Sequence, residues 1–451
     1  MKLPEALATA YETGYREFSW IAELPQAEDP LTLFSKSQHT YKGQRFYWQT
    51  PAQELTLIGC GQLAHIIPSQ LTDLALTQFM NDKQQTIYTN RNLTGTGPLL
   101  FGGLPFNQDH PEKTLWGPLD QGLFYLPALM VSFLEGVPYI TLNFKASSLA
   151  DLTDQWQLRQ KELQAWLEAP LPLEEETAEL RTTEINLEKW LTVVEQTVAA
   201  IKEKSSLKKV VLARQLAITN KHPWQSATIL KRLAEQQQAT YLFALEKEQH
   251  LFIGASPERL LQGTEADYTT ACIAGSIARG NTPAEDDRLG QELLMDEKNQ
   301  LEHQIVVDQI ARDFQQMIAE ELVIQPATLL KNRDIQHLHV PLRGKRKAGT
   351  SLLESVKQLH PTPALGGQPK ELARDFIAQH EPLGRGMYGG PIGWVSLQND
   401  CGEFAVGIRS AILSKQKGCL YAGCGIVADS AAEAERQETA IKFQPMLRAL
   451  D

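Results

Sequence analysis

Near the end of the chain, two carboxylates and one ammonium group are spaced so that they project from one side of a helix. Glu435 and Glu438 are three residues apart, and Lys442 follows four residues later. Residues at these separations share a helix face. Glu438 and Lys442 by themselves would equally suit an ordinary surface ion pair. The surrounding elements must decide whether these three groups form part of a site.

The segment before this helix predicts a strand that could present a ligand to it. Residues 420–427 are mainly of β type, and Gly423 and Gly425 interrupt them. Glycine inside a strand usually marks a bulge or the close approach of a ligand or another backbone. Asp429 and Ser430 then predict the start of the helix. We therefore expect the charged groups to face whatever the two glycines admit.

Size and composition indicate a globular enzyme. The 451 residues could form two or three average domains or one large mixed fold. Hydrophobic residues make up 42% of the chain and charged residues 22%, which leaves ample material for a core. The net charge of −11 argues against a general nucleic-acid binder. An anionic substrate would therefore need local cations or a metal ion.

The chain shows no targeting or membrane signal. Its first residues lack the basic and apolar segments of a signal peptide, and no apolar run approaches the roughly 18 residues that span a bilayer. The five cysteines are odd in number and contain no CxxC pair. We expect reduced thiols in the cytoplasm, no zinc site and no membrane association.

The order of predicted elements divides the chain into three ranges. Residues 1–168 are rich in predicted strands and end in a helix. Residues 169–186 form an acidic, proline-containing connector without a regular period. Residues 187–451 alternate helices, strands and glycine-rich segments. We expect the two long ranges to form one compact domain.

Three candidates in the last range bear acid–base or metal-binding groups. Lys209 begins an apolar strand, where a solvated edge charge is the more common role. Glu258 lies just past a Ser-Pro turn. Glu302 precedes His303 on a long amphipathic helix, and His303 is expected to be structural because the HExxH metal spacing is absent. Glycines at 366, 367, 389, 390 and 393 are too many for simple turns and predict backbone packed against a ligand.

A family resemblance emerges when the motifs are taken together. From Lys209 to the C-terminus the chain contains, in this order, KVVLAR, GASPERLL, IAGSIARG, LEHQIVVD, IQHL, HPTPALGG, RGMYGG, FAVGIRSA and AGCGIVADSAAEAERQET. This series resembles the chorismate-utilising enzymes, and most closely their isochorismate synthase branch, in particular the long form that serves menaquinone biosynthesis. The resemblance implies an α+β fold of two intertwined, pseudo-symmetric halves, with mainly antiparallel sheets, helices outside and a central cleft.

The resemblance also implies roles for individual residues. Lys209 would activate a water molecule, and Glu258 would protonate the departing hydroxyl. Glu302 and Glu438 would hold Mg2+, with Glu435 in support. The substrate would be bound by Gly275, Ser276, His337, Thr362, Tyr388, Arg409, Gly423, Gly425 and Lys442.

The implied reaction converts chorismate into isochorismate. Water adds at C2, the double bonds shift and the C4 hydroxyl leaves. Chorismate is a dianion, so Mg2+ must bridge it to the carboxylates, using the oxygen ligands that this ion prefers. Lys209 must be neutral to act as the base. Glu258 must keep its proton, which apolar surroundings would favour.

Several relatives differ from this chain at informative positions. Ala274 stands where aminodeoxychorismate synthases carry a covalent lysine, and Lys209 and Ser276 depart from the anthranilate synthase pattern. Asn299 stands where relatives often supply another acidic residue. A salicylate synthase or a siderophore-pathway isochorismate synthase stays open, whereas the complete catalytic set disfavours a non-catalytic chorismate-binding relative. We expect no glutamine amidotransferase subunit, and a monomer or weak homodimer.

Overall fold

A computed structural model describes residues 2–70, 73–107, 115–172, 179–203, 206–381 and 383–451, without the side chains of residues 73, 74, 298 and 302. The described helices are α1 Glu5–Glu12, α2 Pro30–Lys36, α3 Gln38–Tyr41, α4 Asp73–Thr86, α5 Leu149–Glu168, α6 Leu187–Glu203, α7 Ser226–Gln236, α8 Pro283–Met295, α9 Glu297–Gln315, α10 Leu352–Leu359, α11 Lys370–His380 and α12 Ala432–Leu450, with short 3-10 turns at Pro68–Gln70 and Gly117–Leu119.

The strands are more numerous and mostly short. They are β1 Glu17–Glu23, β2 Arg45–Gln49, β3 Leu55–Ile66, β4 Ile87–Thr89, β5 Leu99–Gly103, β6 Leu123–Leu134, β7 Val137–Lys145, β8 Arg181–Glu184, β9 Lys209–Thr219, β10 Tyr241–Lys247, β11 His250–Ser256, β12 Arg259–Gly263, β13 Asp267–Ala278, β14 Val323–Ile324, β15 Thr328–Lys331, β16 Ile335–Lys345, β17 Gly367–Gln368, β18 Pro391–Ser396, β19 Gly402–Val406, β20 Ser410–Ser414 and β21 Lys417–Ile426.

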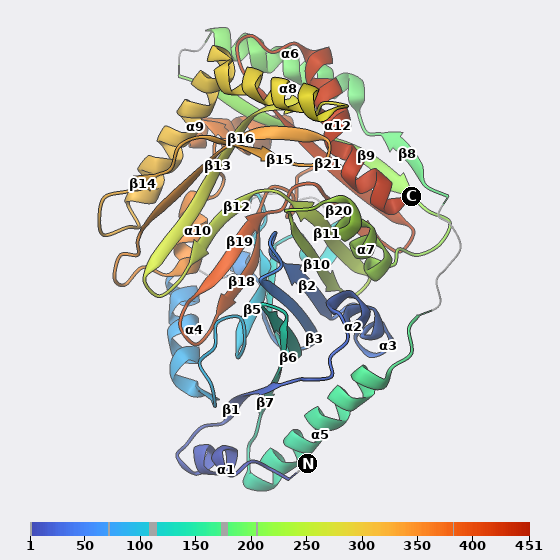
Figure 1. Cartoon of the computed structure of the whole chain (residues 1–451), viewed down its shortest axis with the longest axis vertical. Helices are drawn as coiled ribbons and strands as arrows, with labels where there is room; N and C mark the ends of the chain where they lie inside the picture. The colour runs from blue at the N-terminus through green and yellow to red at the C-terminus, as the bar shows by residue number, and fades with distance from the viewer. Residues whose placement is uncertain (1, 71–72, 108–114, 173–178, 204–205, 382) are drawn as a thin grey trace.

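The strands form one branched network that joins the N-terminal and C-terminal parts of the chain. From β6, one branch runs through β3, β2, β10, β11, β20 and β21 to β9. A second branch runs through β5, β18, β19, β12 and β13 to β16. These pairings are antiparallel, and the helices lie around the outside of the strands (Figure 1). The predicted α+β fold of mainly antiparallel sheets with helices outside is confirmed.

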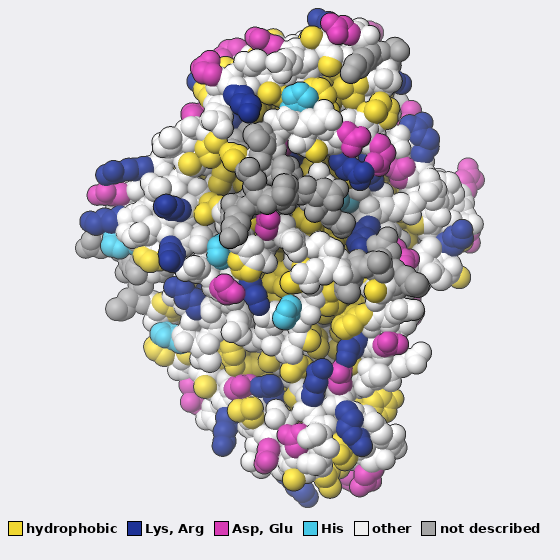
Figure 2. Space-filling view, turned by 180° about the vertical axis from the view of Figure 1, so that it is seen from behind, with side chains coloured by type: hydrophobic (Ala, Val, Ile, Leu, Met, Phe, Trp, Pro, Cys, Tyr) yellow, Lys and Arg dark blue, Asp and Glu magenta, His cyan; other side chains and the backbone are white. Residues whose placement is uncertain are grey.

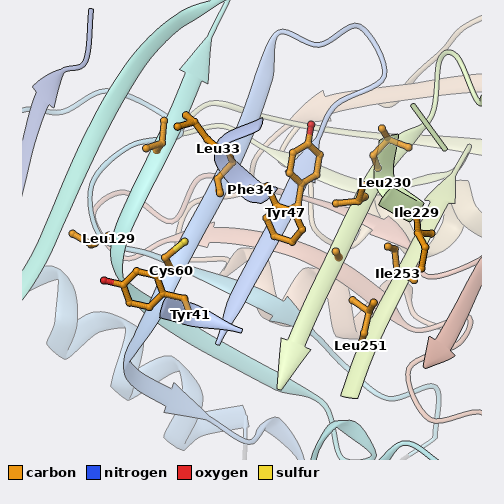
Figure 3. Packing of buried hydrophobic residues seen from close by; sticks show 14 of the residues in the cluster. Leu33, Phe34, Tyr41, Tyr47, Cys60, Leu129, Ile229, Leu230, Leu251 and Ile253 are labelled. Carbon is orange, nitrogen blue, oxygen red and sulfur yellow. The ribbon is translucent and has the colours of Figure 1, made fainter. Parts of the chain in front are cut away.

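Buried side chains from distant parts of the sequence hold the network together. Figure 3 shows one cluster, in which Tyr41 and Cys60 lie beside Leu129 and to which Tyr47 of β2, Ile229 of α7 and Ile253 of β11 also belong. Amphipathic helices such as α7 bury Ile229, Leu230 and Leu233 against these strands. Such burial removes apolar area from water, the main driving force for folding.

Local predictions differ from the structure in two places. Strand β8 lies inside the segment predicted as a connector without regular structure, and it pairs with residues 216–219 of β9. The long amphipathic helix predicted to carry Glu302, over residues 283–314, is two helices. Asp296 ends α8 and caps α9 by accepting a hydrogen bond from the Asn299 amide at 2.7 Å. The domain boundaries at residues 168 and 186 stay predictions.

The surface has mixed charge on the face seen in Figure 2, where Lys and Arg side chains alternate with Asp and Glu side chains. Within the described ranges, the helices lack the combination of length and apolar character that crossing a membrane requires. All five cysteines are buried and none forms a disulfide.

Candidate active site

A cavity lies between the ends of the two branches, where β9 and β21 face β13 and β16. It encloses about 880 Å³, including some space open to solvent. It is lined by Lys209, Val211, Pro257, Glu258, Ile273, Ala274, Gly275, Ser276, His337, Ala364, Leu365, Arg385, Tyr388, Ile408, Arg409, Tyr421, Ala422, Gly423, Gly425, Glu438 and Lys442. Residues predicted from seven separate motifs therefore meet at one place.

Lys209 begins β9 on the wall of the cavity. Its backbone pairs with Gln368 of β17, and the residue is 7% exposed. The alternation of side chains along a strand places Val211 on the same face, and it lines the cavity as well. A solvated charge at a strand edge is therefore the wrong description of this lysine.

Glu258 occupies the turn between β11 and β12 and is 5% exposed. Its amide donates to Ser256 Oγ at 3.3 Å, and its carbonyl accepts from the Val406 amide at 3.0 Å, so the backbone is fixed on both sides. Burial raises the pKa of the carboxyl to about 8, although the positive charges of Arg409, Lys209 and Lys442 oppose the shift. Glu258 therefore carries a proton at neutral pH.

A cationic region lies beside this acid. Burial lowers the pKa of Arg409 below its usual value, although Tyr388 and several carboxylates favour its charged form. Its φ of 51° is in the left-handed region, which favours glycine, so the surrounding structure holds this residue in an unusual backbone conformation. Lys442 donates to the Gly423 carbonyl at 2.9 Å and to Glu438 Oε1 at 2.5 Å. These cations suit a substrate with carboxylates.

A serine and a histidine form a neutral polar pair on the facing wall. Ser276 Oγ lies 2.7 Å from His337 Nδ1. Burial lowers the pKa of His337 to about 3, aided by Arg409 and Lys442, so the ring is neutral. Its Nε2 is buried and has no hydrogen-bond partner among the described residues. This atom is therefore available to a ligand.

Glycines shape both walls, as the strand pattern predicted. Gly275 has a φ of 74° and forms a bulge in β13, where the register to β16 shifts between Ala274 and Ser276. A Cβ at Gly423 would lie 3.2 Å from Val211 Cγ1 and 3.3 Å from the Tyr388 hydroxyl. Any larger residue at position 423 would narrow the cavity.

The acidic end of the site continues into a neighbouring hollow. Glu435, Glu438, Asn299, Ser430 and Asp334 line it. Partial burial and the charge of Glu438 raise the pKa of Glu435, whose Oε2 is buried and unpartnered among the described residues. Two neighbouring carboxylates, one with an unsatisfied oxygen, fit a hard divalent cation.

The third predicted metal ligand can be placed only by its backbone. Glu302 lies on α9, but its side chain is outside the described part of the structure. Among the described side chains, no three His, Cys, Asp or Glu residues gather as a metal site. Glu435 and Glu438 are the predicted metal ligands whose described carboxylates line this hollow.

Thr362 is the substrate-binding candidate that the cavity does not include. Its hydroxyl is buried and unpartnered within the described residues, while Ala364 and Leu365 of the same loop line the cavity. His303 is buried behind the wall, where Nδ1 lies 3.1 Å from the Ala274 carbonyl oxygen, as expected for a structural histidine.

Two polar lining residues, Arg385 and Tyr421, were not among the predicted site residues. Arg385 is three residues before Tyr388 in RGMYGG, and Tyr421 lies within β21, directly before the AGCG motif. The rings of Tyr388 and Tyr421 stack with centroids 5.0 Å apart, and the Trp116 indole donates to the Tyr421 hydroxyl at 3.0 Å. A polar side chain in or next to a motif was the available signal.

Known proteins share this architecture over the full chain. The family described as chorismate binding enzyme matches residues 5–451. Isochorismate synthase MenF of Bacillus subtilis (strain 168) is 36% identical over 453 residues, which cover 99% of this chain and 96% of that protein. MenF of Escherichia coli (strain K12) is 33% identical, with 92% of this chain and 89% of that protein covered.

Solved structures agree with these sequence relatives. The menaquinone-specific isochorismate synthase MenF from Escherichia coli superposes with a TM-score of 0.83 at 26% identity, covering 99% of both chains. Anthranilate synthase component I from Streptococcus pneumoniae TIGR4 gives a TM-score of 0.70 at 22% identity and shares the fold. With a family match over almost its whole length and a relative of this identity and coverage, the chain belongs to the chorismate-binding enzyme family.

Proposed function

We propose that this protein is an isochorismate synthase that isomerises chorismate by adding water at C2 and expelling the C4 hydroxyl, at the entry to menaquinone biosynthesis. The observation that carries the proposal is the pairing, in one cavity, of a buried protonated carboxyl, Glu258, with a buried lysine, Lys209. A reaction that removes one proton and delivers another requires one acid and one base. The full-length similarity to MenF proteins supports the same activity.

Glu258 would act as the general acid. As the C4–O bond breaks, the carboxyl donates its proton to the leaving hydroxyl, which departs as water. The raised pKa keeps this proton available at neutral pH. The cations nearby would then stabilise the carboxylate that remains, because Arg409, Lys209 and Lys442 all act on it.

Lys209 would act as the general base. Its amine takes one proton from the water whose oxygen bonds to C2, and the two double bonds shift toward C4. One water is consumed and one is released, so substrate and product are isomers. The substrate's carboxylates would bind Arg409 and Lys442, with the Ser276–His337 pair supplying a neutral contact.

Mg2+, when bound, would supply positive charge for a substrate carboxylate. Glu435 and Glu438 would hold it, and Glu302 stays a predicted third ligand. We further propose that the protein works in the cytoplasm, in keeping with its five unpaired cysteines, and without an amidotransferase subunit.

The test is to incubate purified protein with chorismate and Mg2+ and to identify the products by chromatography. Isochorismate should accumulate until it is in equilibrium with chorismate. The same ratio should be reached when the reaction starts from isochorismate. Added ammonia should give no anthranilate. Pyruvate released in proportion to turnover would instead indicate a salicylate synthase, and unchanged chorismate would overturn the proposal.

A further inference from the structure

Among the described residues, no strand pairs with β9 along part of one of its edges. On its other side β21 pairs with it from Val210 to Thr219. On this edge β17 pairs with Lys209 and Val210, and β8 pairs with Leu216 to Thr219. Residues 211–215 lie between these two short strands, next to the lysine that lines the cavity. Backbone groups on such an edge need other partners.

A buried ion pair supplies two of those partners, and the Gly366 carbonyl supplies another by accepting from the Val211 amide at 2.8 Å. Arg385 Nη2 donates to the Val211 carbonyl at 2.7 Å, and the Ala213 amide donates to Glu381 Oε1 at 2.8 Å. The guanidinium thus donates a hydrogen bond where the amide of a neighbouring strand would donate, and the carboxylate accepts one where a strand carbonyl would accept. Residues 211 and 213 point their backbone groups to the same edge because the strand period is two.

The pair is itself rigidly held. Arg385 donates to both oxygens of Glu381, through Nε at 2.7 Å and Nη2 at 2.6 Å, and through Nη1 to the Leu365 carbonyl at 3.0 Å. Its guanidinium carbon lies 4.1 Å from the centre of the Phe106 ring. The side chains of Arg385 and Glu381 are 3% and 7% exposed. A bidentate arginine–carboxylate pair of this kind fixes geometry as well as charge.

We propose that Glu381 and Arg385 are positioning residues that set the place of Lys209 by completing the edge of β9. Glu381 does not line the catalytic cavity but a separate hollow bounded by Trp190, Leu212 and His380. It therefore acts on the reaction through β9 and Arg385. The inference rests on the proposed role of Lys209. Catalysis tolerates little displacement, since a shift of about 1 Å can cost about 100-fold in rate.

The test compares Glu381→Gln with an equally buried ion pair elsewhere. Glu381→Gln should lower kcat by about 10- to 100-fold while KM for chorismate changes by less than about threefold. The matched control is Glu246→Gln, which breaks the Arg45–Glu246 pair, whose side chains are 1% and 7% exposed, on β2 and β10. The control should lower the unfolding midpoint similarly and leave kcat unchanged.

A double-mutant cycle separates positioning from general damage. In a Lys209→Gln background, Glu381→Gln should change the remaining rate by less than about threefold, because the group that it positions is gone. An equal loss in both backgrounds would overturn the proposal. So would a rise in KM at unchanged kcat, which would assign Arg385 to substrate binding. A Lys209→Gln variant with full activity would instead refute the base assignment, before the cycle is read.

Arg385→Lys gives a second route if Glu381→Gln does not fold. It keeps the charge but cannot contact Val211, Leu365 and Glu381 together. Deuterium exchange of the peptide covering residues 207–216 should accelerate in this variant, and kcat should fall with it. Unchanged exchange together with unchanged kcat would show that the pair does not hold the strand.

Discussion

Glu258 and Glu438 are carboxylates on the same cavity, influenced by the same three cations, yet their pKa values move in opposite directions. Glu258 is fully buried, and burial raises its pKa to about 8. Partial burial would also raise the pKa of Glu438, but Lys442, Arg409 and Lys209 lower it below its usual value. The same three positive charges therefore lower the pKa of Glu438 but do not overcome the effect of burial at Glu258.

The difference lies in contact and exposure. Glu438 Oε1 is 2.5 Å from Lys442 Nζ, and its side chain is 40% exposed, so it keeps both an ion-pair partner and some water. Glu258 has no salt bridge among the described residues and is 5% exposed. Burial without a contact partner yields a neutral acid, whereas an ion pair yields a carboxylate suited to a metal.

The largest expected effect is at Glu258. Glu258→Gln keeps the shape but removes the transferable proton, so kcat should fall by about 10²- to 10⁴-fold. The same substitution should increase the free energy of unfolding relative to the wild type at alkaline pH. Because the pKa of the carboxyl is raised in the folded state, its contribution to the free energy of unfolding is fully present below pH 4.5 and is lost as the pH rises through about 8. Relative to Glu258→Gln, the wild type should lose on the order of 5 kcal/mol across that window.

Urea unfolding of both proteins at several pH values between 4 and 9 measures this difference. Parallel stability curves would mean that Glu258 is an ordinary ionised glutamate and that the contrast with Glu438 does not exist. The same protonation predicts a declining limb of kcat/KM above pH 8 in the wild type.

The base on the same cavity should show a comparable loss of rate. Lys209→Gln preserves length and hydrogen bonding but cannot accept a proton, so kcat should fall by about 10²- to 10⁴-fold with binding retained. Steady-state kinetics with chorismate gives kcat and KM separately. A rate within a few-fold of wild type would remove Lys209 from the mechanism.

At Glu438 the expected effect is on the metal. Glu438→Gln removes a carboxylate beside the unpartnered Glu435 oxygen, so the Mg2+ concentration for half-maximal rate should rise by about 10- to 100-fold. Glu433→Gln is the control, because Glu433 lies on the same helix with a side chain 60% exposed and pairs with Arg436. Equal responses of the two variants, or full wild-type activity in EDTA, would contradict the metal assignment.

The motifs predicted which residues share the cavity, because most of them lie in a short segment with a recognisable pattern. Lys209, Glu258, Arg409 and Lys442 all line the cavity as expected. The family and the fold were likewise predicted correctly. Such predictions depend on short stretches of sequence, which can be recognised without the structure.

The sequence could not reveal what depends on distant contacts. The Glu381–Arg385 pair contacts β9, about 170 residues earlier, and although Arg385 lies in RGMYGG, no local pattern shows which strand the pair contacts. The glycines show the same limit. They were expected to approach a ligand, but a Cβ at Gly367 would lie 2.2 Å from the Lys209 carbonyl oxygen, and one at Gly393 would lie 2.0 Å from that of Glu403. Their small size serves packing between neighbouring backbones.

The smallest predicted effect tests a neutral group on the same cavity. Ser276→Ala removes the 2.7 Å contact to His337 Nδ1, and a hydrogen bond of this kind contributes about 1 kcal/mol, so kcat/KM should fall by about fivefold. His337, with its pKa lowered to about 3 by burial, stays neutral throughout the working range. The ratio of wild-type to variant kcat/KM should therefore be the same from pH 6 to pH 9. A ratio that changes with pH in that range would show that His337 titrates there, and that burial decides the charge of Glu258 but not of its neighbour.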